Sequence, residues 1–305
     1  MFFRCGAKNT INGDNIEFLP NLPSTNVLGI AELNGELYCA TFYTSDSSQY
    51  LNGIYKLTDN TWTKVLNGGS SYYVKNDFTW NGYGGPTFVS CNGSIYGIGY
   101  YKFDGETLSS TNYSSGYYYE RTFPYGNKLY IFYYSSSYYY MDIFDTESNK
   151  TVKSVKLPFS HTSIAGSVVG YVLNEDNIFV IDHNTNKIYS FNSSDDTWTQ
   201  NGESSEINDG TSIIRYNDKI HFIGKKAAYY VSYNTYEPGP ACLHQINYKS
   251  VNSIFSLLIE TRNPLLCVYN NKLIVCNLLL GSTDSVGRHI TAKSSRCLSV
   301  DLKGE

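Results

Sequence analysis

The chain has 305 residues, including 30 Tyr and 15 Phe, and a formal net charge of −4 at pH 7. Aromatic and β-branched residues suit the pleated, half-buried surface of a strand, so this composition predicts an all-β protein. The slightly acidic balance gives no electrostatic footprint for nucleic acid. No apolar stretch approaches the roughly 20 residues that a helix needs to span a bilayer, so membrane insertion is not expected.

One unit recurs along the chain: an apolar run, a polar turn of two or three residues, and a second, alternating apolar run. An Asn-Gly turn between such runs is the strongest short-range hairpin signal, because both central residues of a type I′ turn need a positive φ. The turns and the first apolar residues of the runs that follow are, in chain order, Asn34-Gly35 with Leu37, Asn92-Gly93 with Ile95, Gly126-Asn127-Lys128 with Leu129, Glu175-Asp176-Asn177 with Ile178, Asn217-Asp218-Lys219 with Ile220, and Asn270-Asn271-Lys272 with Leu273.

These six hairpins decide the predicted fold class. The apolar runs begin 34 to 58 residues apart, about 47 on average, which is typical of propeller blades. Hairpin after hairpin without a helical segment excludes a parallel α/β layout and leaves a sandwich, a barrel or a propeller. Six similar units of blade length favour the propeller. We therefore expect residues 1–305 to form one all-β domain, a six-bladed β-propeller.

Two of the units share a second feature after the hairpin. Gly53–Leu57 leads through Asp59-Asn60 into Thr61-Trp62-Thr63, and Lys187–Phe191 leads through Asp195-Asp196 into Thr197-Trp198-Thr199. This order of strand, polar turn and Trp resembles the third and fourth strands of the kelch repeat. The resemblance covers nearly the whole chain, although the paired glycines of the kelch consensus are absent. It implies that Trp62 and Trp198 pack between adjacent blades, where we expect both to be largely buried.

The two ends of the chain complement each other. Ile16–Pro23, within the N-terminal segment 1–24, resembles the fourth strand of a kelch unit but has no earlier strands of its own. Arg296–Leu302 looks like a third strand with nothing after it. Pairing the two makes the N-terminal segment the outer strand of the last blade. Such a pairing closes the ring and leaves no large unpaired edge at the seam.

No motif in the sequence indicates a metal, cofactor or catalytic site. The seven cysteines include no C-x-x-C pair and several lie in strand-like runs, so we expect reduced, buried thiols that act as small apolar residues. The five histidines lack metal-binding spacing, and His221 lies within a predicted strand. Phosphate-loop, dinucleotide, EF-hand and nucleophile-elbow patterns are absent. The sequence therefore predicts no metal, no cofactor and no catalytic residue, and hence a protein that is not an enzyme.

Tyrosines gather in the second and third units. In strands, half of these side chains point into the blade interfaces, and the outward half can form a recognition surface. Tyr supplies a large amphipathic contact area at low entropic cost, which suits proteins and sugars equally well. The candidate binding residues are Tyr83, Tyr117, Tyr118, Tyr119, Tyr133, Tyr134 and Tyr138.

The opening residues Phe2-Phe3-Arg4-Cys5-Gly6 resemble the starts of tail-associated proteins in phages and phage-derived particles of Clostridia-like bacteria. This resemblance spans about five residues, and the first six lack the basic region and apolar core of a signal peptide. It implies a structural or recognition subunit of a tail, baseplate or fibre that assembles in the bacterial cytoplasm. The expected partners are other protein subunits and a cell-surface glycan. A cytoplasmic kelch-type adaptor and a glycan-binding or glycan-active protein remain as alternatives.

Overall fold

The computed structural model contains strands and turns, and none of its described residues forms a helix long and apolar enough to cross a membrane. The residues that the structure describes are 9–10, 16–24, 26–45, 48–71, 73–74, 88–97, 101–113, 118–160, 168–182, 185–203, 212–217, 219–225, 240–246, 251–283, 289–292 and 295–301.

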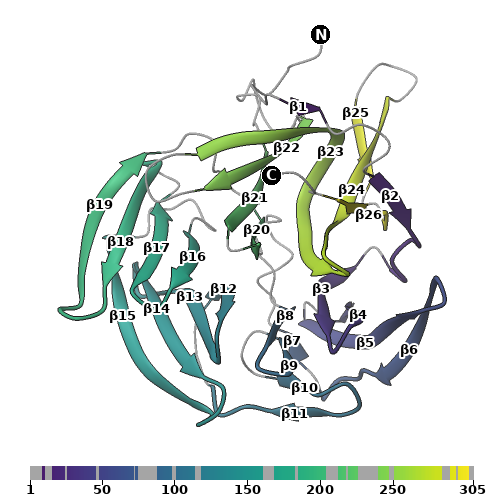
Figure 1. Ribbon diagram of the computed structural model, residues 1–305. Coiled ribbons are helices and arrows are strands. Elements are labelled where there is room, and N and C mark those ends of the chain that lie inside the picture. The colour runs from purple at the N-terminus through teal and green to yellow at the C-terminus, as the bar shows by residue number, and fades with distance from the viewer. Residues whose placement is uncertain are drawn as a thin grey trace.

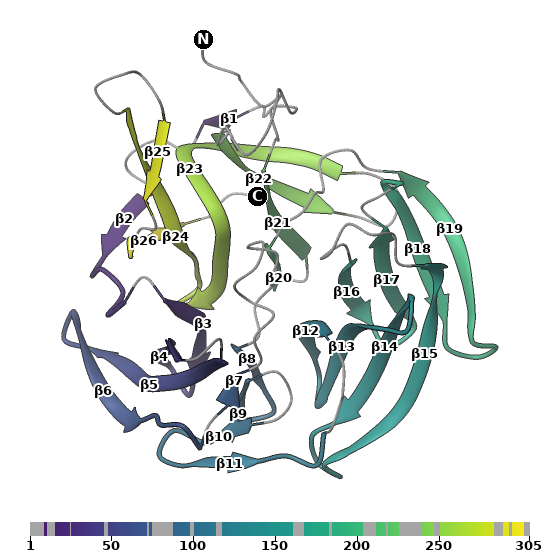
Figure 2. The ribbon, with the colours of Figure 1, turned by 180° about the vertical axis from the view of Figure 1, so that it is seen from behind.

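The described strands form five hydrogen-bonded sheets that stand in a ring around a central axis, so the chain is an all-β propeller (Figures 1 and 2). Four sheets are separate blades. The first blade contains β3 (Val27–Leu33), β4 (Glu36–Ser45), β5 (Ser48–Thr58) and β6 (Thr61–Asn67), with β7 (Tyr73–Val74) paired to β5. The second contains β8 (Phe88–Cys91), β9 (Ser94–Gly97), β10 (Tyr101–Phe103) and β11 (Leu108–Ser110). The third contains β12 (Tyr118–Tyr125), β13 (Lys128–Ser135), β14 (Tyr138–Asp145) and β15 (Lys150–Ser160), and the fourth contains β16 (Val168–Asn174), β17 (Asn177–Asp182), β18 (Lys187–Asn192) and β19 (Thr197–Glu203).

The fifth sheet, which we call the closing sheet, has nine strands and joins the last two predicted hairpins. Its main path runs β2–β26–β24–β23–β22–β21–β20, with β1 paired to β23 and β25 paired to β24. The sequence analysis predicted six separate blades, whereas the long strand β23 connects the last two hairpins into one sheet. The strands are β1 (Asn9–Thr10), β2 (Ile16–Leu19), β20 (Ser212–Tyr216), β21 (Lys219–Lys225), β22 (Pro240–Ile246), β23 (Val251–Tyr269), β24 (Lys272–Thr283), β25 (His289–Ala292) and β26 (Cys297–Val300).

The six predicted hairpins are confirmed. The second strands β4, β9, β13, β17, β21 and β24 each begin one residue before the apolar residue that predicted them. In the first turn, Asn34 and Gly35 have φ values of 54° and 81°, as a type I′ turn requires. The turn at Asn270 and Asn271 has φ values of 49° and 57° without any glycine, because Asn tolerates the left-handed region better than most residues.

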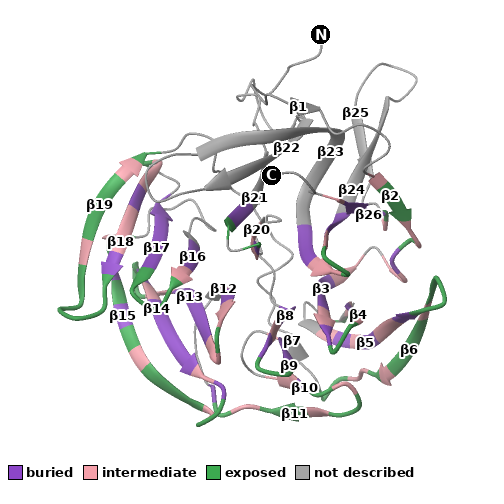
Figure 3. Cartoon of the chain, in the orientation of Figure 1, coloured by how far each residue is buried: buried purple, intermediate pink, exposed green. Residues whose placement is uncertain are grey.

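The hydrophobic core lies between neighbouring blades, and the inner strands are buried on both faces. Along β4, Leu37 and Cys39 face the closing sheet, whereas Tyr38 and Ala40 face the second blade. Figure 3 shows the consequence: buried residues follow the inner and middle strands, and exposed residues follow the outer strands β6, β15 and β19. Blades also approach closely, since a Cβ on Gly170 would overlap the ring of Phe132 in the neighbouring blade.

The seam of the ring forms by pairing the two ends of the chain, as the sequence predicts. Strand β2 runs antiparallel to β26, with Ile16 opposite Val300 and Leu19 opposite Cys297. Beyond β2, the Leu22 N–H donates to the Ser295 carbonyl at 2.6 Å, and the Leu22 side chain is buried against the first blade. A short N-terminal strand therefore connects the last strand of the chain to the first blade.

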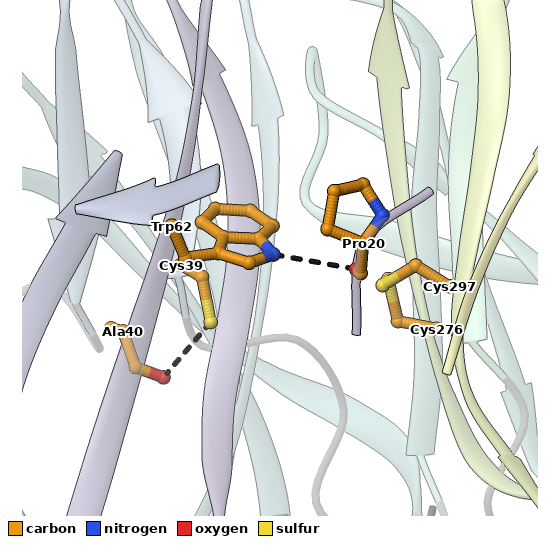
Figure 4. Close-up of a disulfide and its surroundings, with 6 residues drawn as sticks. All are labelled: Pro20, Cys39, Ala40, Trp62, Cys276 and Cys297. Atoms are coloured by element: carbon orange, nitrogen blue, oxygen red, sulfur yellow. Dashed lines mark hydrogen bonds between the residues drawn. A yellow bond between two sulfur atoms is a disulfide. The ribbon is translucent and has the colours of Figure 1, made fainter. Parts of the chain in front are cut away.

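The cysteine prediction is partly wrong. Cys39, Cys91 and Cys267 are free and buried as expected, but Cys276 and Cys297 form a disulfide with Cα atoms 4.3 Å apart (Figure 4). These two residues lie directly opposite each other on β24 and β26. The detour of the chain through β25 separates them by 21 residues, so no close cysteine pair appears in the sequence. The disulfide fixes β26, the strand on which β2 closes the ring.

Deleting residues 1–22 tests the seam. The truncated chain loses the β2–β26 ladder and the buried Leu22 side chain, and β26 becomes an unpaired edge. We expect the free energy of unfolding to fall by at least about 3 kcal/mol, from lost hydrogen bonds and apolar burial. Urea denaturation monitored by circular dichroism measures this change. A truncated chain with the midpoint of the full-length protein would show that the seam contributes nothing.

Candidate functional site

A cavity with a volume of about 610 Å³ lies on the axis of the ring, between the inner strands. Its walls come from the innermost strands β3, β8, β12 and β20 and from the second half of β23. It reaches the end of the ring where the hairpin turns lie, because Asn34, Asn92 and Gly126 contribute to its lining. A cavity of this size lies within the ordinary range for small-ligand sites.

Arg215 on β20 is the cationic residue of this lining, and its side chain reaches across two neighbouring blades. Its guanidinium donates a hydrogen bond to the Leu173 carbonyl at the end of β16. The same group lies over the ring of Tyr125, at the end of β12, with Cζ 4.9 Å from the ring centroid. The guanidinium thus contacts a carbonyl and an aromatic face from two neighbouring blades.

Glu32 provides the negative charge of the same lining and occupies the matching position on β3. Arg215 and Glu32 each precede a hairpin turn by two residues, at Asn217 and Asn34. The Glu32 carboxylate accepts the Gly35 N–H, and its backbone carbonyl accepts the Ser90 hydroxyl from the second blade. Sequence reasoning missed both charged residues, although aligning the six turns places them at one repeat position.

The described residues offer no metal centre. They contain no group of three or more His, Cys, Asp or Glu side chains that could hold an ion. His221 is a buried strand residue, as predicted, and burial lowers its pKa to about 4. Its imidazole is therefore neutral at pH 7.

A buried carboxylate connects the second and third blades. Asp142 on β14 accepts hydrogen bonds from the Tyr113 hydroxyl and from the Tyr133 hydroxyl, each at 3.2 Å. Burial raises the pKa of Asp142, and hydrogen bonds from Ser154, Tyr113 and Tyr133 lower it by less. Because Tyr113 follows the outermost strand of the second blade, this cluster joins two blades through polar contacts rather than forming an open site.

The predicted tyrosine surface is only partly described. Tyr83 and Tyr117 lie outside the described residues, and for Tyr118 and Tyr119 the structure describes the backbone of β12 alone. Tyr133 is 6% exposed and bonded to Asp142, so it belongs to the interior and its assignment to a surface is wrong. Tyr138 is exposed, at 39% of its surface, and Tyr134 is half-buried.

The strand pleat separates the remaining tyrosines. Successive side chains point to opposite faces of a strand, and cross-strand partners share a face. Tyr133 therefore shares a face with its partner Tyr140, and the two rings stack at 5.5 Å. Tyr134 pairs with Tyr139 on the other face, which packs towards the fourth blade. Tyr138 lies on the same face as Tyr140, and the Lys156 ammonium lies 3.1 Å from its ring centroid.

The two predicted inter-blade tryptophans lie at blade junctions and make equivalent contacts. The Trp198 indole N–H donates to the Lys156 carbonyl of the third blade at 3.0 Å. The Trp62 indole N–H donates to the Pro20 carbonyl beyond β2 at 3.4 Å (Figure 4). Both rings are partly buried and pack against the core clusters at these junctions. Each lies on an outer strand, where part of the ring meets solvent.

Comparisons with known proteins give no family. No protein-family model matches the chain, and no curated protein matches it. A solved structure of YjhT is similar over 85% of this chain and 74% of YjhT, with 14% sequence identity and a TM-score of 0.34. No function passes to this chain from that similarity.

Replacing Trp198 by Phe removes the hydrogen bond to the Lys156 carbonyl and part of the contact with the third blade. Because the ring is only half-buried, we expect a loss of about 1–2 kcal/mol, below the roughly 3–5 kcal/mol of a buried Trp truncation. Urea denaturation gives the value, with Val152→Ala on exposed β15 as a control that should change little. If Trp198→Phe lowers the free energy of unfolding no more than the control does, Trp198 does not stabilise the junction.

Asp142 predicts a pH dependence of stability. Its pKa in the folded protein is raised above its ordinary value of 3.8, so its contribution is fully present below that value and is lost as pH rises through the folded pKa. Asp142→Asn cannot ionise. We therefore expect the stability of the variant relative to wild type to improve between pH 4 and pH 7, measured by urea denaturation at both. A difference that is constant, or that moves the other way, would contradict the assignment.

Proposed function

We propose that the chain is a six-bladed, kelch-like propeller in which the closing sheet counts as two blades. Strand β23 pairs with β22 through Val251–Glu260 and with β24 through Glu260–Tyr269, and the ladder with β24 has a register shift between Thr261 and Leu265. Divided at this shift, β20, β21, β22 and the first half of β23 make one set of four strands. The second half of β23 with β24, β26 and β2 makes another. Two four-stranded sets match the size of the four separate blades.

We propose further that this propeller acts by binding rather than by turnover, as a structural or recognition subunit of a larger assembly. The observation that carries the proposal is the exposed end of the third blade. There, Tyr138 has 39% of its surface exposed, and the Lys156 ammonium lies over its ring. An aromatic side chain held in place loses little entropy on contact with a partner, and Tyr is enriched among the residues that dominate interfaces.

The assembly that we propose is a phage tail, baseplate or fibre, or a related tail-like particle. The resemblance of Phe2–Gly6 to tail-associated proteins supports this choice over a cytoplasmic adaptor. Such a particle is built in the bacterial cytoplasm and meets a host surface after lysis. The partners proposed are neighbouring protein subunits and a host-surface glycan, and no cofactor is proposed.

Tyr138→Ala tests the binding surface. The variant removes the exposed ring while leaving the buried Tyr133 and Tyr139 in place, so we expect a folded protein that loses its partner. The measurement is co-purification of the tagged chain from the native assembly, with circular dichroism as the test of folding. We expect recovery of the partner to fall at least about tenfold, the effect of losing one interface hot spot.

A matched control is Tyr55→Ala in the first blade, because Lys64 lies 5.3 Å from the Tyr55 ring centroid in a similar pair. This variant should retain the partner. If Tyr138→Ala folds and retains its partner as fully as Tyr55→Ala does, the end of the third blade is not the interface. Identification of the co-purified partner separates the tail assembly from an adaptor or a glycan-directed protein.

A further inference from the structure

We propose that the Cys276–Cys297 disulfide is a redox latch on the seam of the ring: reduction loosens the hold of the closing sheet on both chain ends, and oxidation locks them in place. The disulfide joins β24 to β26, and β26 in turn holds β2. The inference concerns closure of the ring and not the binding surface at Tyr138. It is therefore independent of the proposed function, and either one can fail without the other.

The noncovalent hold on β26 is small. This strand pairs through four residues with β24 on one edge and through four residues with β2 on the other. Short ladders near chain ends open more readily than ladders in the middle of a sheet. Cys276 and Cys297 are the last pair of the β24–β26 ladder, so their bond keeps the two strands together when the ladder frays. Once the bond is reduced, the remaining link between these cysteines is the 21-residue detour of the chain.

The disulfide lies beneath the seam that it stabilises. Cys276 and Cys297 are both 0% exposed. They belong to one core cluster with Leu22 of the N-terminal segment and Cys39 of the first blade, and Trp62 packs against the same cluster (Figure 4). A reductant in solution therefore reaches the sulfur atoms only when the first blade and the N-terminal segment separate from the closing sheet. Access to the disulfide and opening of the seam are thus one event.

The neighbouring free thiols do not compete with an external reductant. Cys39 and Cys267 lie in the same core cluster as the disulfide, and both are free. Burial raises the pKa of each thiol, so both stay protonated at neutral pH. The thiolate is the form that attacks a disulfide. The latch therefore responds to a thiol from solution and not to rearrangement among these buried cysteines.

The reaction is a thiol–disulfide exchange with a small dithiol. One thiolate of the dithiol attacks a sulfur of the Cys276–Cys297 bond, which breaks, and the other cysteine leaves as a thiolate that takes up a proton. The second thiol of the reductant then attacks the mixed disulfide, releases the remaining cysteine and closes into a cyclic disulfide. Two electrons and two protons pass from the dithiol to the two cysteines. A small-molecule disulfide reverses the reaction.

The coupling between the disulfide and the seam is reciprocal. A bond that favours the closed seam is itself favoured by the closed seam, because both effects are one free energy. A reducing compartment keeps such cysteines as thiols, whereas an oxidising medium preserves the disulfide. The same chain therefore has a seam that can open under reducing conditions and a locked seam under oxidising ones.

Hydrogen exchange of the full chain, read by mass spectrometry, tests the latch. We compare protein in oxidised glutathione with protein in dithiothreitol and expect reduction to speed exchange in residues 16–22 and 295–301 at least about tenfold. Strands β13 and β14 of the third blade should not change. In the double variant Cys276→Ala/Cys297→Ala, exchange at the seam should be fast in both media. This variant therefore controls for every other effect of the reductant.

The rate of reduction tests the reciprocal effect. Leu22→Ala removes a side chain that is 4% exposed in the cluster around the disulfide. We expect dithiothreitol to reduce Cys276 at least about tenfold faster in this variant, as measured by alkylation and peptide mass mapping. Leu157→Ala is the matched control, because Leu157 is 2% exposed and lies in the core around the third and fourth blades. Its disulfide should be reduced at the wild-type rate.

Three results would overturn the proposal. The first is a native protein whose Cys276–Cys297 bond dithiothreitol leaves intact. The second is a reduced protein that exchanges in residues 16–22 and 295–301 as slowly as the oxidised one. The third is equal acceleration of reduction by Leu157→Ala and Leu22→Ala, which would show that reduction follows global unfolding and not opening of the seam. Should Leu22→Ala not fold, the exchange of the wild-type chain decides.

Discussion

The ring depends on one short antiparallel contact, in which four residues of β2 pair with four residues of β26. Sheets in a ring bury both faces of their inner strands only if the last sheet also meets the first. Leu22 carries the contact into the core of the first blade, and Trp62 donates back to Pro20. The Cys276–Cys297 disulfide fixes β26 from its other edge. The Lys272–Glu17 ion pair at 3.0 Å adds little, because it is largely exposed.

Other blade junctions are also joined by hydrogen bonds from a side chain to a backbone carbonyl, but without a strand ladder across the described contact. Trp198 contacts the third blade as Trp62 contacts the N-terminal segment, through one indole hydrogen bond to a backbone carbonyl 42 residues earlier in each case. Closer to the axis, Ser90 donates to the Glu32 carbonyl, and Arg215 donates to the Leu173 carbonyl. Each contact joins one blade to the next through a backbone acceptor. Bonds of this kind fix side chains at the inner strands, which is why the cavity has a defined lining.

Two different physical constraints act on the polar residues of the third blade. The pleat assigns Tyr133 and Tyr134 to opposite faces, so a run of tyrosines in sequence does not become one surface. Position along the strand then decides exposure. Tyr138 lies next to the hairpin turn at Ser136 and Ser137 and is exposed, whereas Asp142, four residues further along β14, is buried with its pKa raised by burial. Exposed and buried polar residues therefore occur within one strand pair.

Much of the fold could be predicted from the sequence, because its determinants are local. Asn34-Gly35 and the related turns at Asn92-Gly93, Gly126, Asn217 and Asn270-Asn271 determine where hairpins begin, since positive φ values favour Asn and Gly. The spacing of the hairpins indicates a propeller, and the unmatched strands at the two ends predict the β2–β26 pair. The turn signals depend on the backbone geometry of neighbouring residues. The seam follows from counting the predicted strands and finding two that lack a partner.

The remaining features were decided by the tertiary structure, because they depend on residues that meet only across blades. Cys276 and Cys297 become partners only when β24 and β26 lie side by side. Trp62 and Trp198 are half-buried because their strands are outermost. The cavity lined by Arg215, Glu32 and Thr122 arises only when inner strands from successive sheets surround one axis. Nothing within the segment of Arg215 indicates that this residue faces the centre of a ring.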